Sequence, residues 1–248
     1  KQYIDEVKDE PFFLFYTLQQ PHVPRTPHPR FVGSSGMGPR GDVIKEADWC
    51  IGEIYNHLEK NNLLENTLII ISSDNGPVLN DGYYDDAVEK IGDHTPFGIL
   101  RGGKYSLFEA GTKVPFITYW KNKIKPQVSN EMVSQIDYLN SISSLIGSEI
   151  RSTDGVDLSD VFFKNEGLGR DDLVIEASRR TAYRSGDWVM IPPHKGPAIH
   201  YNVNIELGNS VDYQLYNLKD DPSQKINLAE SNTEKLQEMI ESFKKIKS

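Results

Sequence analysis

The fold is decided by the stretch Thr67-Leu68-Ile69-Ile70-Ile71-Ser72-Ser73-Asp74-Asn75-Gly76-Pro77, an apolar run that stops at a carboxylate, an amide and a turn. A short Leu- and Ile-rich run bounded by turn residues predicts a strand buried on both faces, as in a parallel sheet. Ligands of open α/β sheets bind beyond the carboxyl ends of such strands. Asp74 and Asn75 would offer adjacent oxygen ligands to a hard divalent cation there. An ordinary turn is the alternative, because Asp-Asn-Gly-Pro is also good turn chemistry.

A second buried strand is predicted over Pro11–Leu18, which is aromatic and apolar and is followed by His22. The next predicted element is a helix over Asp42–Lys60, whose apolar face includes Cys50, so we interpret this cysteine as a core residue. Strand, helix and strand predict a parallel pair with a right-handed crossover. If that pairing is direct, His22 and the Asp74–Asn75 pair lie at one edge of the sheet.

The middle of the chain alternates loops with regular elements. Residues 78–95 are polar and predict a surface loop that extends to His94, which we interpret as a surface histidine. Lys104 follows two glycines, where a close backbone approach and a point charge suit an anion, although a solvated loop lysine is the commoner case. A strand over Val114–Trp120 and an amphipathic helix over Met132–Ile146, capped by Gly147, complete this part.

Strands alternate with turns from about residue 170 onward. We expect a small antiparallel sheet packed with a helix, formed by Leu173–Ala177, Ala182–Ile191 with a turn inside it, Tyr213–Leu218 and the helix Thr233–Lys247. The predicted division is therefore residues 1–168 as an α/β domain and residues 169–248 as an α+β subdomain.

Composition sets outer limits on function. The 248 residues carry a formal net charge of −9, which argues against a nucleic-acid partner. No apolar stretch reaches the roughly 20 residues that span a bilayer, so no membrane is expected. The single cysteine, Cys50, allows no intrachain disulfide and leaves the compartment open.

Several segments together resemble one family. They are Pro11-Phe12-Phe13-Leu14 with Gln20-Pro21-His22-Val23-Pro24, Gly41-Asp42-Val43, Ser73-Asp74-Asn75-Gly76-Pro77, Leu100-Arg101-Gly102-Gly103-Lys104 with Phe108-Glu109-Ala110-Gly111, and Gln214-Leu215-Tyr216-Asn217-Leu218. In this order the chain resembles the C-terminal part of an arylsulfatase-type sulfatase, in the alkaline-phosphatase-like superfamily. The resemblance implies an α/β fold with a sheet flanked by helices and a small C-terminal α+β subdomain. Each match is weak alone, and their shared order makes them strong.

The resemblance also implies a nucleophile that this sequence lacks. The family uses a formylglycine made within a Cys-x-Pro-Ser-Arg type motif, and no such motif occurs among residues 1–248. The first residues, Lys1–Val7, look like the end of an amphipathic helix, and no signal peptide opens the chain. We therefore expect a fragment that lacks the N-terminal part of the fold and is inactive alone, whose full-length parent is a sulfuric ester hydrolase.

By resemblance, Asp74 and Asn75 would bind a divalent cation, which we expect to be Ca²⁺, with Mg²⁺ as the alternative. Lys104 and His22 would be catalytic and would bind the sulfate ester, with His22 able to act as a general acid. The substrate would be a small-molecule or glycan sulfate ester. The alternatives are a phosphodiesterase or phosphonate hydrolase of the same superfamily, or a non-catalytic protein that binds sulfated glycans. Many bacterial relatives are periplasmic or extracellular, but this sequence shows no compartment.

Overall fold

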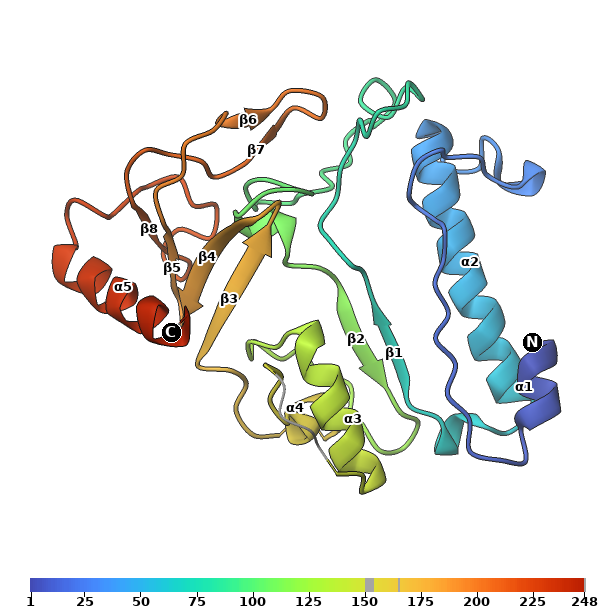
Figure 1. Cartoon of the computed structure of the whole chain (residues 1–248). Helices are drawn as coiled ribbons and strands as arrows, with labels where there is room; N and C mark the ends of the chain where they lie inside the picture. The colour runs from blue at the N-terminus through green and yellow to red at the C-terminus, as the bar shows by residue number, and fades with distance from the viewer. Residues whose placement is uncertain (150–153, 165, 248) are drawn as a thin grey trace. The chain divides into compact units, whose positions relative to one another are not determined.

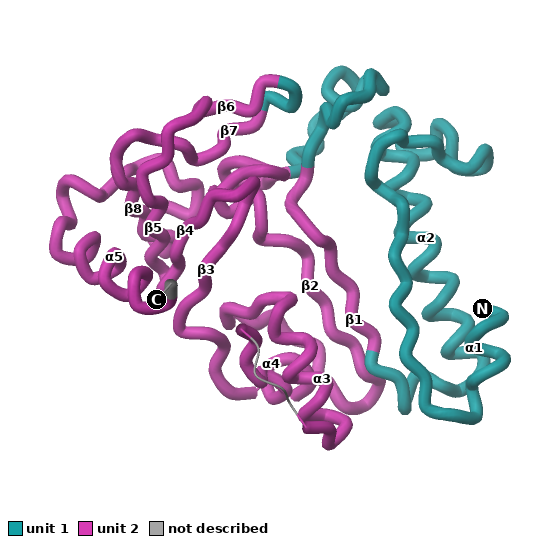
Figure 2. Tube along the Cα trace, viewed as in Figure 1, with its two compact units in different colours: residues 1–68, 78–96, 202–204 teal, residues 69–77, 97–201, 205–248 magenta. Residues whose placement is uncertain are grey.

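The computed structural model describes residues 1–149, 154–164 and 166–247. The chain forms two compact units, coloured teal and magenta in Figure 2, and each is described by itself. Unit 1 comprises residues 1–68, 78–96 and 202–204, and unit 2 comprises residues 69–77, 97–201 and 205–248. The boundary expected between residues 168 and 169 divides the chain differently and stays a prediction.

Unit 1 is built around the long helix α2 (Gly38–Lys60), which begins four residues before the predicted start. A proline in its first turn suits this position, because the missing N–H would have no helical partner there. The predicted N-terminal helix is present as α1 (Gln2–Val7), and its Ile4 is only 1% exposed. Cys50 is half-buried on α2, so its interpretation as a core residue is wrong. Two short 3-10 helices complete the unit, η1 (Pro29–Phe31) and η2 (Leu64–Asn66).

The segment Pro11–Leu18 is not a strand. Its residues pair with no other strand among the described residues, and the side chains of Phe13 and Phe15 are 74% and 79% exposed. The predicted parallel pair and its right-handed crossover are therefore wrong. An apolar pattern favours a strand, but a strand also needs a hydrogen-bonded neighbour, which pattern alone does not supply.

Strand β1 (Ile69–Ser72) begins unit 2 and pairs antiparallel with β2 (Phe116–Tyr119), with Ile70 opposite Thr118. The sequence correctly predicts both strands, but the expected burial of β1 on both faces is wrong. Its three isoleucines are half-buried and Ser72 is exposed. A ribbon of two strands leaves both outer edges open, which explains this exposure. Residues 78–95 contain no helix or strand, and His94 is exposed, as predicted.

The predicted helix over Met132–Ile146 is shorter than expected. The 3-10 helix η4 (Gln135–Asp137) leads into α3 (Tyr138–Ile146), and Gly147 ends it with a left-handed φ of +68°, as a glycine C-cap does. The expected apolar face is not buried, since Leu139 and Ile146 are 60% and 71% exposed. The short helix α4 (Ser159–Phe163), which pattern did not reveal, packs Phe162 against the ring of Tyr138.

The C-terminal sheet confirms the prediction most fully. Its strands lie in the order β3-β4-β5-β8, all antiparallel, and helix α5 (Thr233–Lys247) packs on them. The strands are β3 (Asp172–Ala177), β4 (Arg180–Ser185), β5 (Trp188–Ile191) and β8 (Gln214–Asn217). A short hairpin of β6 (Ile199–His200) and β7 (Ile205–Glu206) was missed, because two-residue strands carry almost no periodicity.

Alternate residues of this sheet enter two separate cores, as the period of a strand requires. On one face Met190 and Leu215 pack with Met239 of α5. On the other face the neighbouring residues Val189 and Tyr216 pack against Leu107 and Phe108. The second core matters for the site, because Leu107 and Phe108 follow Lys104 almost directly. Within the described residues, no helix has the length and apolar character needed to cross a bilayer.

Candidate functional site

Asp74 and Asn75 form a turn directly after β1. The amide of Asn75 donates to Asp74 Oδ1 at 3.0 Å, and Asn75 Nδ2 donates to the carbonyl of Gly76 at 2.9 Å. These bonds orient both side chains locally. The second carboxylate oxygen of Asp74 and the carboxamide oxygen of Asn75 are thereby left as the atoms that could coordinate a cation.

Gly76 ties this turn to the segment after Lys104. Its amide donates to the carbonyl of Gly111 at 2.8 Å. A Cβ atom at residue 76 would lie 1.7 Å from the carbonyl oxygen of Ala110, so only glycine allows the two backbones to approach this closely. The sequence motif explained Gly76 by a turn. The structure shows that the close contact with the distant Ala110 segment also requires glycine at this position.

Lys104 lies in the same unit and contacts the same turn. Its amide donates to the carbonyl of Pro77 at 3.0 Å. A Cβ on the preceding residue, Gly103, would lie 2.8 Å from that carbonyl oxygen, so this glycine too is needed for close approach. The structure therefore brings the Asp74–Asn75 turn and the Lys104 loop together, as the predicted site requires.

Arg101 fastens the Lys104 loop to the C-terminal sheet region, a role that sequence reasoning missed. Its guanidinium donates to both carboxylate oxygens of Glu206, at 2.7 and 3.0 Å, and to the carbonyl of Gln224 at 2.7 Å. It also lies 4.0 Å from the ring centre of Phe108. The hydrogen bond raises the pKa of Arg101 and lowers the pKa of Glu206. In the sequence, the only indication of this supporting role is the position of Arg101 beside Gly102 and Gly103.

His22 belongs to unit 1. Its Nδ1 lies 2.7 Å from the carbonyl oxygen of Val23, and its Nε2 lies 3.8 Å from the carboxylate of Asp81. The side chain is 61% exposed, whereas that of Asp81 is 10% exposed. An imidazole with this exposure can reach a ligand.

A buried arginine holds the His22 loop. Arg25 donates to the carbonyl of Pro21 at 3.2 Å, to the carbonyl of Leu79 at 2.9 Å and to the carboxylate of Asp85 at 2.9 Å. The side chain of Arg25 is only 3% exposed. The polar segment 78–95, predicted as a surface loop, therefore also supports His22, which polarity alone does not reveal.

The donor set of the Asp74–Asn75 turn suits a hard cation in kind, because both side chains offer oxygen. Among the described residues, no three His, Cys, Asp or Glu side chains gather into a metal-binding group. Ca²⁺ takes about six to eight oxygen ligands. Asp74 and Asn75 could therefore supply only part of a coordination sphere.

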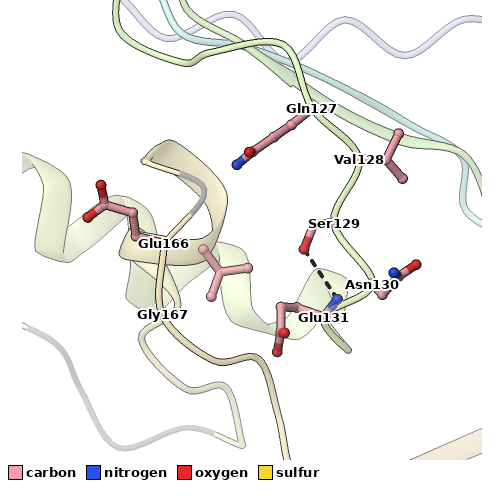
Figure 3. Close-up of a pocket in the computed structure, with 8 residues that line it drawn as sticks. Gln127, Val128, Ser129, Asn130, Glu131, Glu166 and Gly167 are labelled. Atoms are coloured by element: carbon pink, nitrogen blue, oxygen red, sulfur yellow. Dashed lines mark hydrogen bonds between the residues drawn. The ribbon is translucent and has the colours of Figure 1, made fainter.

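A separate surface pocket of about 260 Å³ lies elsewhere in unit 2 (Figure 3). Its lining is mostly polar and includes two carboxylates, Glu131 and Glu166. Glu131 accepts a hydrogen bond from the amide of Gly169, at 2.6 Å, so its carboxylate has a structural partner. None of the predicted site residues lines this pocket.

The sequence and the fold match known proteins. Residues 1–148 match the family model described as Sulfatase. An N-acetylgalactosamine-6-O-sulfatase of Bacteroides thetaiotaomicron is 44% identical over 100% of this chain and 49% of its own length, and an arylsulfatase A of Bos taurus is 29% identical over 95% and 48%. The chain therefore belongs to the sulfatase family, as its motifs predicted.

Solved structures agree with this assignment. One from work on glycosaminoglycan metabolism by Bacteroides thetaiotaomicron superimposes with a TM-score of 0.96 at 43% identity, covering 99% of this chain and 52% of that one. A sulfatase from Pseudoalteromonas sp. gives a TM-score of 0.80 at 25% identity, covering 98% and 50%. The chain thus spans about half the length of the relatives it matches, and the α/β sulfatase fold class predicted from sequence is confirmed.

Proposed function

We propose that the full-length protein containing this chain hydrolyses sulfate esters. Membership of the sulfatase family carries the proposal, and the local geometry supports it. An anion-binding lysine loop and an oxygen-rich turn share a hydrogen bond of 3.0 Å between Lys104 and Pro77. In this proposal Lys104 binds a sulfate oxygen as a compact point charge.

His22 contacts the sulfate ester and donates a proton to the leaving oxygen. A histidine suits this task because its proton affinity lies close to neutral pH. Arg25 would hold the loop that carries His22, and the carboxylate of Asp81 lies 3.8 Å from its Nε2. His22 is therefore assigned as general acid and substrate ligand.

Asp74 and Asn75 would hold a divalent cation, Ca²⁺ in the first place and Mg²⁺ as the alternative. When bound, such a cation neutralises charge on the sulfate group and polarises its oxygens. The formylglycine nucleophile and the remaining ligands are expected outside residues 1–248, so the 248-residue chain alone is expected to be inactive.

The proposed substrate is a sulfated glycan, with 6-O-sulfated N-acetylgalactosamine as the leading candidate. This choice rests on the relative named for that activity, which is 44% identical to this chain over its whole length. A protein with a net charge of −9 would repel a sulfated glycan unless positive charge is concentrated at the binding site. Lys104 would supply that local positive charge.

The test is sulfate release by the full-length protein from N-acetylgalactosamine 6-sulfate, with the 4-sulfate as a matched competitor. Lys104→Ala is expected to lower kcat/KM at least about a hundredfold, since it removes a charge from the anion site. Lys113→Ala, an exposed lysine nearby in sequence, is the control and keeps full rate.

The two alternatives give different results in this assay. Faster cleavage of an aryl phosphodiester or phosphonate than of either sulfate would identify a phosphodiesterase or phosphonate hydrolase instead. Tight binding of sulfated glycans with no sulfate release would identify a non-catalytic binding protein.

A further inference from the structure

The first residue of β4 is a buried arginine that reaches the Lys104 loop. Arg180 is 6% exposed. Its guanidinium donates to four oxygens, those of Tyr105 O at 2.7 Å, Asn209 Oδ1 at 2.7 Å, Leu207 O at 3.0 Å and Ala177 O at 3.2 Å. Arg180 thus connects the C-terminal sheet directly to the residue after Lys104.

Within the described residues, every acceptor of Arg180 is a neutral oxygen. Arg25, another buried arginine, instead contacts the carboxylate of Asp85 at 2.9 Å. A buried charge without an opposite charge is costly, and burial lowers the pKa of Arg180 accordingly. Arg180 is therefore held by hydrogen bonds to oxygens that an apolar side chain would leave without a donor.

Tyr105, the target of Arg180, has an unusual backbone. Its φ is +79°, in the left-handed region that L side chains rarely adopt. Its ring stacks on His200, with the ring centres 5.1 Å apart. Tyr105 is therefore fixed at two points, at its carbonyl by Arg180 and at its ring by His200. Such strained residues persist only where their surroundings hold them, and they cluster at functional sites.

Hydrogen bonds therefore hold the backbone on both sides of the Lys104 side chain. Its amide is held by Pro77, on the Asp74–Asn75 turn, and the carbonyl of the next residue is held by Arg180. We propose that Arg180 is a positioning residue that sets the direction of the Lys104 side chain and adds positive charge behind the anion site. The inference rests on the proposed function in one respect, namely that the anion is a sulfate ester.

The test compares Arg180→Gln with the wild type in the full-length protein. The first measurement is the rate at which acetic anhydride labels the Lys104 amine, read by mass spectrometry against exposed Lys113. The second is kcat/KM for N-acetylgalactosamine 6-sulfate. We expect the labelling rate of Lys104 alone to change several-fold, and kcat/KM to fall between roughly tenfold and a hundredfold.

The matched control is Tyr183→Phe. Tyr183 lies on the same strand and is 2% exposed, but it belongs to the core formed with α5, and its hydroxyl contacts Asp172 at 2.9 Å. This variant loses a partly buried hydrogen bond without touching Tyr105. It is expected to lower the melting temperature and to leave the Lys104 labelling rate unchanged.

A second comparison tests the backbone strain. Glycine adopts a φ of +79° freely, so the effect of Arg180→Gln should shrink in the background of Tyr105→Gly. Arg180→Lys retains the cation but not the fork of donors, so it should show an intermediate loss. If Arg180→Gln fails to fold, Arg180→Lys provides the same readouts.

The outcomes separate this inference from the proposed function. A Lys104 labelling rate that depends on Arg180, in a protein that releases no sulfate, supports the positioning role and overturns the sulfatase proposal. A labelling rate that changes no more than in Tyr183→Phe overturns the positioning role, whatever the enzyme hydrolyses. An undiminished effect in the Tyr105→Gly background also contradicts it.

Discussion

The amide of Lys104 donates a 3.0 Å hydrogen bond to the carbonyl of Pro77. Pro77 closes the turn that begins at Asp74, so the predicted anion ligand and the predicted cation ligands are parts of one backbone arrangement. Gly76, inside that turn, makes a second link by donating to the carbonyl of Gly111 at 2.8 Å. Displacing this turn is therefore expected to disturb both ligands together.

Gly76→Ala should be destabilising for this reason. The new Cβ would lie 1.7 Å from the carbonyl oxygen of Ala110, and a backbone atom cannot move aside as a flexible side chain can. We expect the free energy of unfolding to fall by about 1–3 kcal/mol, the usual cost of overpacking. Urea unfolding monitored by circular dichroism measures it.

Gly52→Ala is the matched control. Gly52 lies within α2, and a Cβ there would meet nothing within 4 Å. Alanine is the better helix former, so this variant should gain about 0.5–1 kcal/mol. Equal stability changes in the two variants would show that Gly76 and Ala110 do not approach as described.

Asp137→Asn tests a deeply buried ion pair of unit 2. Asp137 is 0% exposed, and both of its carboxylate oxygens accept hydrogen bonds from Arg170. Removing its charge leaves the largely buried guanidinium of Arg170 without this opposite charge, with the carbonyl of Asp154 as a remaining acceptor at 2.7 Å. The expected loss of stability is about 3–5 kcal/mol, measured by urea unfolding.

The control for this pair is Asp160→Asn. Asp160 also forms an ion pair, with Lys164, but the two side chains are 60% and 63% exposed. Solvent screens such a pair, so the change should stay within about 0.5 kcal/mol. Similar losses in Asp137→Asn and Asp160→Asn would contradict the distinct burial of the two pairs.

Sequence patterns predicted the elements that are stabilised locally. The strands and helix after residue 170 appear almost as expected, because their period-two alternation sends Met190 and Val189 to opposite cores. The turn at Asp74 and the C-cap at Gly147 follow from single-residue chemistry in the same way. The motifs also predicted that Asp74, Asn75 and Lys104 belong to one site, and the backbone bond between Lys104 and Pro77 is consistent with that prediction.

The failures concern long-range pairing. An apolar run such as Pro11–Leu18 shows a preference for extended chain but does not specify a partner strand, so the parallel pair was wrong. The supporting arginines were missed for a related reason. The supporting side chains Arg25, Arg101 and Arg180 donate hydrogen bonds to backbone carbonyls of distant segments. Every residue has a backbone carbonyl, so residue types do not reveal which one is the acceptor.

Asp74→Asn in the full-length protein should weaken the binding of Ca²⁺. Affinity for this cation depends on the number of charged ligands, so losing one carboxylate should raise the dissociation constant by roughly an order of magnitude or more. Isothermal titration calorimetry with CaCl₂ after chelator treatment measures it, and a parallel titration with MgCl₂ distinguishes the two cations. Asp93→Asn, which removes an exposed carboxylate, is the control. Unchanged affinity in Asp74→Asn would exclude Asp74 as a ligand.

Asp42→Asn should make the free energy of unfolding of unit 1 depend less on pH in the acid range. Asp42 is 2% exposed and accepts hydrogen bonds from the amide of Gly33, and from the amide and hydroxyl of Ser35. Burial alone would raise the pKa of Asp42, but the hydrogen bonds from Ser35 and Gly33 outweigh it, so the pKa is lowered. A carboxyl with a lowered pKa stabilises the fold above its unfolded pKa, about 3.9, and this stabilisation is lost as the pH falls through the folded pKa. Urea unfolding of the wild type and Asp42→Asn from neutral to acid pH should therefore show a stability difference that is largest near neutrality and shrinks in acid.

Asp9→Asn, at an exposed carboxylate, should show no such trend. A difference for Asp42→Asn that stays constant or grows in acid would contradict the role of Asp42 as a charged acceptor.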